Sequence, residues 1–354
     1  MYLSDFDFDL PVELIAQEPP AERGHSRLLT LQRSTGALTD CRFLDLPQLL
    51  DPGDLLVVND TKVFAARLLG RRLPGGGAAE CLLVRRIADA PPGATTEVWE
   101  ALVHPGQRLR EGSRLEFRGG EHMISAEVLN RRFHGRRTLR LESHGSSLTE
   151  SIDAIGHTPL PPYIKRPDSP ADRDRYQTIF ATSRGSIAAP TAGLHFTPEI
   201  LSALEARGVE RITVTLHVGY GTFQPIRVAT VEDHRMEPEH YEVSEAAAAA
   251  INRARGRNRR VVAVGTTTTR TLESVPVDER GNVRAAAGAT SLFIRPGHRF
   301  GVVSALITNF HLPQSSLLLL VSAFAGRDQV LGAYRHAVEQ RYRFYSYGDA
   351  MLIV

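Results

Sequence analysis

One segment of the chain combines the residue types that proton transfer beside a bound ligand requires. It reads Ala-Ala-Pro-Thr-Ala-Gly-Leu-His-Phe and ends with His195 and Phe196. An imidazole can carry a proton near neutral pH, and small residues such as Gly193 let a ligand approach the backbone closely. Because a lone histidine is more often a hydrogen-bonded structural residue, the segment by itself leaves both roles open.

A second polar segment, Asn59-Asp60-Thr61-Lys62, directly follows an apolar strand candidate. It places an amide, a carboxylate, a hydroxyl and one of only two lysines side by side. Folds of the α/β class hold ligand groups in loops at strand ends, so this segment is a candidate binding loop. The alternative is a helix cap formed by Asp60 or Thr61.

A third segment, Gly-Thr-Thr-Thr-Thr-Arg from Gly265 to Arg270, stands between a strand candidate and a helix candidate. Backbone N–H groups at a helix N-terminus favour an anion, such as a phosphate or the carboxylate of an amino acid. Threonines in this position could equally cap the helix. The segment therefore predicts an anion site or a plain helix start.

Three further segments concentrate histidine, glycine and aromatic residues. They are His217–Phe223, Thr308–Pro313 and Phe344–Asp349. The Gly-x-Gly of the first lacks the spacing of a dinucleotide-binding fingerprint and also suits a hairpin turn. Tyr345 and Tyr347 of the last could stack on nucleic-acid bases or pack in the core.

The stretch from His234 to His240 holds two histidines and two glutamates, a composition found in metal sites. No second set of ligands accompanies it, so we predict that the protein has no metal site.

Composition limits the class of protein. The chain has 354 residues, of which 42% are hydrophobic and 23% are charged, as in folded globular proteins. No apolar run approaches the roughly 18 residues that span a bilayer, and the first residues are acidic, so neither a membrane anchor nor export is expected. The only cysteines, Cys41 and Cys81, have no cysteine nearby. A reducing cytoplasm suits such a chain.

The net charge of +2 does not by itself indicate a nucleic-acid partner. Nearly all cations are arginines, whose planar guanidinium can donate two parallel hydrogen bonds to a phosphate. The alternative is a genome-wide compositional bias. Arginine clusters at Arg131-Arg132, Arg136-Arg137 and Arg253–Arg260 are therefore weak support for an RNA partner.

Short strand-like runs recur from about residue 66 to residue 142, with turn-forming Gly and Pro stretches between them and little helix signal. These runs are Ala66–Leu73, Glu80–Ile87, Val98–His104, Arg114–Arg118, Met123–Asn130 and Thr138–Glu142. Six strands at this spacing are typical of a small antiparallel barrel or sandwich. We assign residues 66–151 to an inserted β-barrel domain.

On both sides of this insert, helix and strand signals alternate. The predicted strands include Leu28–Gln32, Asp54–Asn59 and Arg260–Val264, and a strand also runs from Arg211 to Val218. The predicted helices begin at Thr197-Pro198-Glu199 and cover Ser244–Arg255, Ser315–Ala325 and Asp328–Tyr342. Short connections between alternating elements favour a layered α/β/α fold. Residues 1–65 and 152–354 are therefore predicted to form one discontinuous α/β domain.

Taken together and in this order, the motifs resemble those of the S-adenosylmethionine:tRNA ribosyltransferase-isomerase family along nearly the whole chain. The matching runs are Asp5–Pro11, Leu14–Gln17, Pro52–Lys62, Ile155–Arg166, Tyr176–Phe180, Ala188–Thr197, Thr215–Phe223, Val264–Thr267, Arg270–Ser274, Thr308–Pro313 and Tyr342–Leu352. Two positions depart from the pattern. Ser304 stands where an acid is expected and Glu237 where a histidine is common, which puts a role for these two side chains in doubt.

The resemblance implies an α/β/α domain interrupted by a β-barrel, in agreement with the segmentation above. It also implies an enzyme of queuosine biosynthesis that acts on a tRNA carrying 7-aminomethyl-7-deazaguanine at the wobble position. The ribosyl part of S-adenosylmethionine is transferred and isomerised to give epoxyqueuosine, and adenine and methionine are released. S-adenosylmethionine is consumed as a substrate, so no cofactor is expected, and the resemblance favours a cytoplasmic monomer.

This chemistry implies roles for the polar segments. His195, His217 and His311 become the candidate proton carriers, without assignment of base and acid, and Asp60 could orient one of them or hold a ribose hydroxyl. The candidate substrate-binding residues are Asn59, Thr61, Lys62, Thr191, Gly193, Gly219, Gly221, Thr222, Gly265, Thr266, Thr267, Arg270, Asn309, Tyr345 and Tyr347. The candidate RNA-binding residues, on a hairpin of the barrel, are Arg131, Arg132, Arg136 and Arg137.

Two other classes of function remain possible from the residues alone. A nucleoside-processing hydrolase or phosphoribosyl-type transferase would use the Gly-Thr-Thr loop, but it would leave the basic hairpin without a role. A non-catalytic RNA-binding protein would not need histidine, asparagine and glycine gathered at strand ends. Dependence of turnover on modified tRNA separates the first from the family reaction, and any release of adenine excludes the second.

Overall fold

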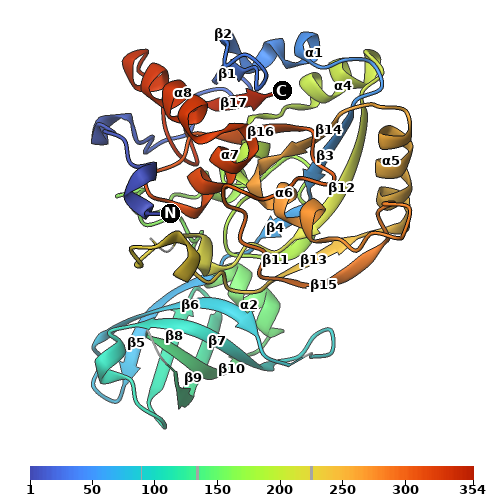
Figure 1. Ribbon diagram of the computed structural model, residues 1–354. Helices are drawn as coiled ribbons and strands as arrows, with labels where there is room; N and C mark the ends of the chain where they lie inside the picture. Colours follow the sequence, from blue (N-terminus) through green and yellow to red (C-terminus); the bar gives the residue numbers. More distant parts are fainter. Residues whose placement is uncertain (89, 133–134, 224–225) are drawn as a thin grey trace.

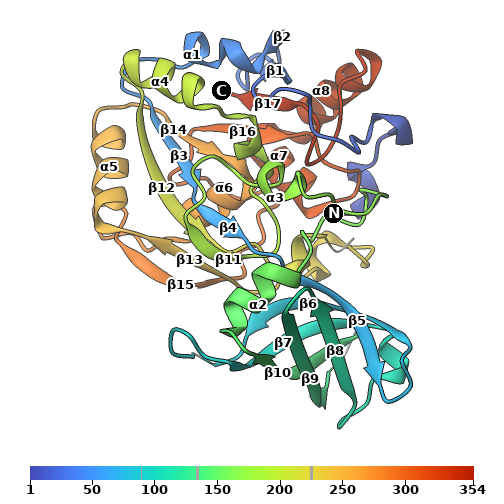
Figure 2. The same cartoon turned by 180° about the vertical axis from the view of Figure 1, so that it is seen from behind.

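The computed structural model describes residues 1–88, 90–132, 135–223 and 226–354, except for the side chains at 222 and 223. Figures 1 and 2 show an α/β body that carries both chain termini and a β-barrel attached to one end of it. The barrel is formed by one continuous insertion. The predicted fold class, a layered α/β/α domain interrupted by an antiparallel β-barrel, is confirmed.

A nine-stranded mixed sheet, in the order β15-β13-β12-β3-β14-β16-β17-β1-β2, forms the centre of the α/β body. Its strands are β1 (Arg27–Leu31), β2 (Leu38–Arg42), β3 (Leu55–Asn59), β12 (Glu210–Leu216), β13 (Glu239–Val243), β14 (Val261–Val264), β15 (Ala286–Thr290), β16 (Ala305–Asn309) and β17 (Ala350–Ile353). The four strands β12, β3, β14 and β16 are parallel to one another. Their carboxyl ends therefore meet at one edge of the sheet.

Helices cover both faces of this sheet. One face packs against α5 (Glu245–Gly256), α7 (Ser316–Ala325) and α8 (Arg327–Glu339). The other face packs against α1 (Leu46–Leu49) and α4 (Pro198–Ala206). Residues of β14 alternate between the two cores as the strand period requires, with Val261 and Ala263 on the first side and Val262 and Val264 on the second.

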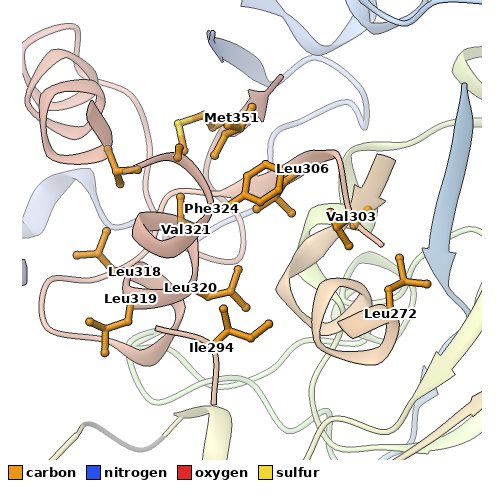
Figure 3. Packing of buried hydrophobic residues seen from close by; sticks show 14 of the residues in the cluster. Leu272, Ile294, Val303, Leu306, Leu318, Leu319, Leu320, Val321, Phe324 and Met351 are labelled. Atoms are coloured by element: carbon orange, nitrogen blue, oxygen red, sulfur yellow. The ribbon is translucent and has the colours of Figure 1, made fainter. Parts of the chain in front are cut away.

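The apolar helix predicted at Ser315–Ala325 is α7, and it lies in the centre of the larger core. Figure 3 shows its leucines and Val321 packed near Ile294, Leu306 and Met351. Ser315 caps the helix by accepting a hydrogen bond from the Leu318 N–H. No single helix among the described residues is long and apolar enough to cross a membrane, and α7 with α8 passes that test only as a pair bent by 115°.

Most predicted helix starts agree with the structure. Thr197 and Ser244 cap α4 and α5 through their hydroxyl groups. One start differs: α6 (Gly265–Ser274) begins at Gly265, directly after β14, rather than after a turn formed by Gly265–Thr268. The positive φ of Gly265, 89°, makes this immediate strand-to-helix change possible, because side chains disfavour that backbone conformation.

The barrel is closed by six antiparallel strands in the order β10-β7-β6-β5-β8-β9. They are β5 (Arg67–Leu73), β6 (Ala78–Arg86), β7 (Thr96–His104), β8 (Arg114–Gly119), β9 (His122–Arg131) and β10 (Arg136–His144). All six strands coincide with the predicted runs to within a few residues. The fully buried Cys81, Leu115, Phe117, Ile124 and Leu139 are among the residues that fill its interior.

The return from the barrel to the α/β body differs from the predicted boundary after residue 151. A helix, α2 (Leu148–Ile155), spans this position, and its Leu148 and Ile152 pack into the barrel core. The Ser147–Glu150 capping box starts the helix. The boundary inferred from composition therefore divides a helix that the barrel holds by hydrophobic contacts.

Three short elements join the two bodies. Strands β4 (Thr61–Val63) and β11 (Ser183–Ser186) pair in parallel beside the main sheet, and α3 (Asp172–Arg175) lies in the segment before β11. A bridge between Arg67 and His157 ties the first barrel strand to the returning chain. The barrel thus leaves and re-enters the α/β body at neighbouring points.

Candidate active site between the α/β body and the barrel

Polar groups gather where the four parallel strands end. Asn59 closes β3, His217 follows β12, Gly265 follows β14 and Asn309 closes β16. Ligands of open α/β sheets bind at the carboxyl ends of parallel strands, and this edge faces the barrel junction. Two hollows open here, one inside the α/β body and one between the body and the barrel.

The first hollow, which we call the inner cavity, is narrow: its volume is about 50 Å³, well below that of an open small-molecule site. Thr191, Thr266, Thr267, Asn309, His311 and Tyr345 are among its lining residues. Tyr163, Tyr176, Ala188 and Val218 also line it. None of the lining residues is acidic, lysine or arginine. The lining is thus polar and partly aromatic but carries no charged side chain, and a ligand the size of a nucleoside would have to widen the cavity on binding.

The second hollow, the interdomain cleft, has a volume of about 650 Å³ and is lined by residues of both bodies. The barrel contributes Arg85, Trp99, Glu100 and Arg136, and the α/β body contributes His217, Gly219, Gly221 and Glu237 among others. This volume is large enough for one nucleotide. Val218 lines both hollows, so they adjoin at the segment that follows β12.

His195 lies beside the inner cavity but is not one of its lining residues. Its Nδ1 is 2.7 Å from the Ser26 hydroxyl and its Nε2 is 3.2 Å from the Asn309 amide nitrogen. Burial lowers the pKa of His195 to about 4. Both nitrogens are occupied, so the structure favours the structural role that the sequence left open over the predicted proton transfer.

His311 lines the inner cavity, and its Nε2 is 2.8 Å from the Thr308 hydroxyl. Burial lowers its pKa to about 3, so the imidazole is neutral at pH 7. Its backbone N–H donates to the Tyr334 hydroxyl at 3.0 Å, which fixes the loop after β16. His311 is therefore held in place with a neutral ring facing the ligand space.

His217 lines the interdomain cleft. Its Nδ1 lies 2.7 Å from the Thr61 hydroxyl, and burial followed by the nearby His240 lowers its pKa. The ring lies flat on Gly185 of β11, where a Cβ atom would come within 2.7–2.8 Å of three ring atoms. Any residue other than glycine at position 185 would therefore displace the imidazole. His217 is neutral, oriented and exposed to the cleft, as a general base must be.

Asp60 and Asn59 hold the surrounding backbone rather than a ligand. The Asp60 carboxylate accepts from the Thr215 hydroxyl at 2.6 Å, and its charge raises the pKa of the nearby His217 against the larger, opposite effect of burial. Both polar atoms of the buried Asn59 amide are used by Thr61, Leu216 and Thr267. Neither residue lines a hollow. The predicted substrate contacts of Asn59 are therefore wrong, because its amide is saturated by protein groups.

The prediction for the Gly265–Arg270 segment divides into two parts. Gly265, Thr266 and Thr267 line the inner cavity at the start of α6, as a binding loop would. Arg270 instead points away and forms a buried ion pair with Glu239, while its Nε donates to the Leu292 carbonyl at 3.0 Å. Glu239 also accepts from the Gly219 N–H at 2.8 Å, so the pair connects α6 to the cleft.

The other predicted substrate-binding residues divide between cavity and core. Thr191 and Tyr345 line the inner cavity, and Gly219 and Gly221 line the cleft. Gly193 is packed against Thr178 and Phe180, where a Cβ atom would come within 2.7 Å of a methyl carbon. The buried Tyr347 donates its hydroxyl to Asp172 at 2.9 Å. Close packing explains Gly193 and a buried hydrogen bond explains Tyr347, and neither residue lines the inner cavity or the cleft.

Of the two remaining predicted residues, one lines neither hollow and the side chain of the other lies outside the described part of the chain. Lys62 is exposed on β4 and lines neither hollow. The side chain of Thr222 lies outside the described part of the chain. Among the described residues, no group of three or more histidine, cysteine or acidic side chains could hold a metal ion.

The four arginines of the β9–β10 hairpin occupy different environments. Arg137 is only 1% exposed, and its guanidinium donates to the carbonyls of Gly106, Leu109 and Arg136. These hydrogen bonds occupy its guanidinium, but Arg137 lines the same groove as Arg131 and Arg132, so its contact with RNA stays a prediction. Arg136 is paired with Glu100 of the barrel and with Glu237 of the α/β body. Arg131 and Arg132 are exposed.

Several site residues were missed in the sequence. Ser26 fixes His195 and Gly185 supports His217, although neither lies in one of the segments that the sequence singled out. Tyr163 lines the inner cavity, and its ring is 3.7 Å from that of Tyr345 in an edge-on arrangement. The Ile155–Arg166 run contains Tyr163, so this residue could have been found. Trp99 of the barrel carried no such signal.

Fold and site together define a two-domain α/β enzyme with a narrow cavity, free of charged lining residues, beside a cleft that both domains line. Residues 3–353 match the family described as "Queuosine biosynthesis protein". The chain belongs to this family. The resemblance inferred from its motifs is confirmed.

Relatives match the chain over its full length. It is 54% identical over 353 residues to an S-adenosylmethionine:tRNA ribosyltransferase-isomerase of Anaeromyxobacter sp. (strain Fw109-5), covering 100% of this chain and 99% of that one. A protein of the same name from Solibacter usitatus (strain Ellin6076) is 50% identical over 370 residues, covering 100% of both. The crystal structure of a Thermotoga maritima S-adenosylmethionine tRNA ribosyltransferase has 39% identity and a TM-score of 0.55, covering 99% and 100%.

The buried histidines predict a pH dependence of stability. In the folded protein the pKa values of His195 and His311 are lowered to about 4 and about 3, whereas both are 6.5 in the unfolded chain. Their contribution to stability is complete above pH 6.5 and is lost as the pH falls. Each should reduce the free energy of unfolding by roughly 1.4 kcal/mol per pH unit between pH 6 and pH 5.

Urea unfolding at several pH values measures this slope. His195→Asn and His311→Asn should each flatten it by about the contribution of one proton. The same change at His25, an exposed residue, serves as the control. An unchanged slope in both buried variants would mean that these histidines are not held neutral.

Proposed function

We propose that the chain transfers and isomerises the ribosyl moiety of S-adenosylmethionine onto 7-aminomethyl-7-deazaguanine at the tRNA wobble position. The products are epoxyqueuosine in the tRNA, adenine and methionine. The observation that carries the proposal is the pair of adjoining hollows at the carboxyl ends of the parallel strands: a narrow inner cavity with a polar and aromatic lining, and a cleft of about 650 Å³ shared by both bodies. The names of the full-length relatives support the same reaction.

The inner cavity is the proposed site of S-adenosylmethionine. The first backbone N–H groups of α6, at Thr266 and Thr267, are donors for a carboxylate such as that of the methionyl group. The tyrosine rings and small apolar residues provide surfaces for the adenine and the sugar. Since S-adenosylmethionine is consumed, we propose that the reaction needs no further cofactor and no metal ion.

The interdomain cleft is the proposed site of the wobble nucleotide. Phe64 and Trp99 form an aromatic pair with ring centroids 5.7 Å apart, and both line the cleft near His217. Proteins that read single-stranded RNA stack splayed bases on such rings. The base would then lie close to Val218, where the cleft adjoins the inner cavity.

His217 is the proposed proton acceptor. In the proposed reaction a base removes the proton next to the sulfonium, and adenine leaves after protonation. The aminomethyl nitrogen then attacks the opened sugar, and an epoxide forms as methionine departs. His217 is neutral, and its Nδ1 is held by Thr61, which leaves Nε2 for the substrate. His311, neutral in the inner cavity, is the second candidate for proton transfer.

Unpaired arginines of the barrel form the proposed contact with the tRNA backbone. Arg67, Arg71, Arg85, Arg118, Arg136 and Arg140 each form an ion pair with a glutamate. Arg108, Arg131 and Arg132 instead line one groove and have no acidic partner among the described residues. The charge of Arg131 further lowers the pKa of Arg137, after burial, as expected for neighbouring cations without an anion.

We also propose that the enzyme acts as a monomer in the cytoplasm. Each chain carries both hollows and the arginine groove, so one copy is enough to bind both substrates. The two cysteines, Cys41 and Cys81, form no disulfide. Gel filtration with light scattering would measure the oligomeric state.

Release of adenine tests the reaction directly. Purified protein should release adenine from S-adenosylmethionine only when tRNA with the aminomethyl-deazaguanine wobble base is present. Mass spectrometry of the RNA should then find epoxyqueuosine. Folded protein that releases no adenine with verified substrates contradicts the proposal, and release without tRNA favours a small-molecule enzyme.

Replacing His217 tests its role as the base. His217→Asn should lower the rate of adenine release by about 10²- to 10⁴-fold, because general base catalysis contributes an effect of that size. Binding of tRNA, followed through the fluorescence of Trp99, should change little, since Trp99 is the only tryptophan and lines the cleft. His336→Asn, on α8, is the matched control. Near-normal turnover of the His217 variant would exclude the assignment.

Neutralising the arginine groove tests the contact with tRNA. The triple variant Arg108→Gln, Arg131→Gln and Arg132→Gln should raise KM for tRNA but leave KM for S-adenosylmethionine unchanged. It should also reduce the slope of log K against log salt by about 2 to 3. The control replaces Arg71, Arg118 and Arg140, which are paired with glutamates. Equal effects of both triple variants would show that the groove is not a specific contact.

A further inference from the structure

The side-chain amide of Asn309 has one atom without a partner. Asn309 ends β16, is 2% exposed and lines the inner cavity. Its Nδ2 donates to the Tyr345 carbonyl at 2.9 Å and is 3.2 Å from Nε2 of His195. Its Oδ1 is buried and has no hydrogen-bond partner among the described residues. Buried polar atoms are nearly always paired, so this acceptor needs an explanation.

The neighbours of Asn309 determine which amide atom faces which group. A backbone carbonyl can only accept, so the amide atom beside the Tyr345 carbonyl must be the nitrogen. That same nitrogen faces Nε2 of His195, which must then carry a lone pair rather than a proton. The proton of the neutral ring is therefore on Nδ1, where it donates to the Ser26 hydroxyl. The burial that lowers the pKa of His195 maintains this neutral state.

This chain of hydrogen bonds prevents the amide from rotating. A rotated amide would place Oδ1 against the Tyr345 carbonyl and expose a donor to the cavity. Oδ1 is consequently a fixed acceptor without a partner among the described residues. A ligand in the inner cavity that donates an N–H group would pair it.

We propose that Oδ1 of Asn309 accepts a hydrogen bond from the exocyclic amine of the adenine of S-adenosylmethionine, and that His195 is the residue that positions it. The inference rests on the proposed function. The aromatic rings of Tyr163 and Tyr345, which lie beside Asn309 in the lining, suit a purine. The other donors of this ligand are the α-ammonium group and the ribose hydroxyls. The α-ammonium group would find no carboxylate among the lining residues. The ribose hydroxyls are present in both the adenine and the purine ligand, so the comparison of these two ligands distinguishes them from the exocyclic amine.

The test compares three ligands on two proteins. The ligands are S-adenosylmethionine, its analogue with purine in place of adenine, and its analogue without the α-amino group. Wild-type protein should prefer adenine over purine by at least about 10-fold, both in binding and in kcat/KM for base release with modified tRNA. Asn309→Ala should remove most of this preference while keeping the preference for the α-amino group.

The quantity to compare is the ratio of the values for the adenine ligand to those for the purine ligand. Unlike a single rate, this ratio separates recognition of the base from effects on folding and from leaving-group chemistry. The intrinsic difference between adenine and purine as leaving groups is the same in both proteins and cancels. Asn252→Ala is the matched control, because both amide atoms of Asn252 are bonded to the backbone of Val283, away from the cavity. It should lower stability and leave every ligand ratio unchanged.

Two substitutions of His195 test whether it positions Asn309. His195→Phe removes the acceptor for the Asn309 nitrogen and should weaken the adenine preference several-fold. His195→Gln, whose Oε1 can accept the same hydrogen bond, should retain more of it. If His195 had a purely structural role, both substitutions would lower the melting temperature without changing the preference for the adenine ligand over the purine ligand.

Each outcome decides a different point. An Asn309→Ala protein that keeps the wild-type preference for adenine overturns the proposal, and so does a loss of preference for the α-amino group alone. If wild-type protein binds the three ligands with the expected preference but releases no base, the reaction proposed above fails and the recognition by Asn309 stands. If none of the three ligands binds, both are wrong.

Discussion

The side-chain amide of Asn59 holds together the edge of the sheet on which the site is built. Strands β3 and β12 run parallel and begin to separate after Asn59, where the backbone ladder between them ends. Oδ1 of Asn59 accepts from the backbone N–H groups of Thr61 and Leu216 there, and Nδ2 donates to Leu216 O and to the Thr267 hydroxyl. One buried residue thus joins the ends of two strands to the start of α6.

This junction positions groups on both sides of the sheet edge. Thr61, which Asn59 fixes, is hydrogen-bonded to His217 of the interdomain cleft. Thr267, also fixed by Asn59, lines the inner cavity. A change at Asn59 would leave buried polar groups unpaired at three points, so its cost would exceed that of one hydrogen bond. The distance between the two hollows depends on this amide.

The two hollows differ in electrostatic character because one lies within the α/β body and the other lies between the surfaces of two bodies. The inner cavity lies within the α/β body, where burial keeps His311 neutral and no charged side chain enters. The cleft lies between two surfaces, and charged residues of both line it. There the buried pair of Arg270 and Glu239 fixes the Gly219 backbone, and Arg136 of the barrel reaches Glu237. Glu237 therefore serves as a link between the bodies.

The sequence by itself determined the fold class, the six barrel strands and the family, because these depend on local periodicity and on long motifs. It also found Thr191, His217, His311, Asn309 and Tyr345, which line the hollows and stand in those motifs. Only the tertiary structure decided which polar residues face a ligand. Asn59 and His195 look like site residues in the sequence, but partners distant along the chain saturate them. Gly185 and Ser26 gain their roles only from contacts that folding creates, and one sequence carries no signal of such contacts.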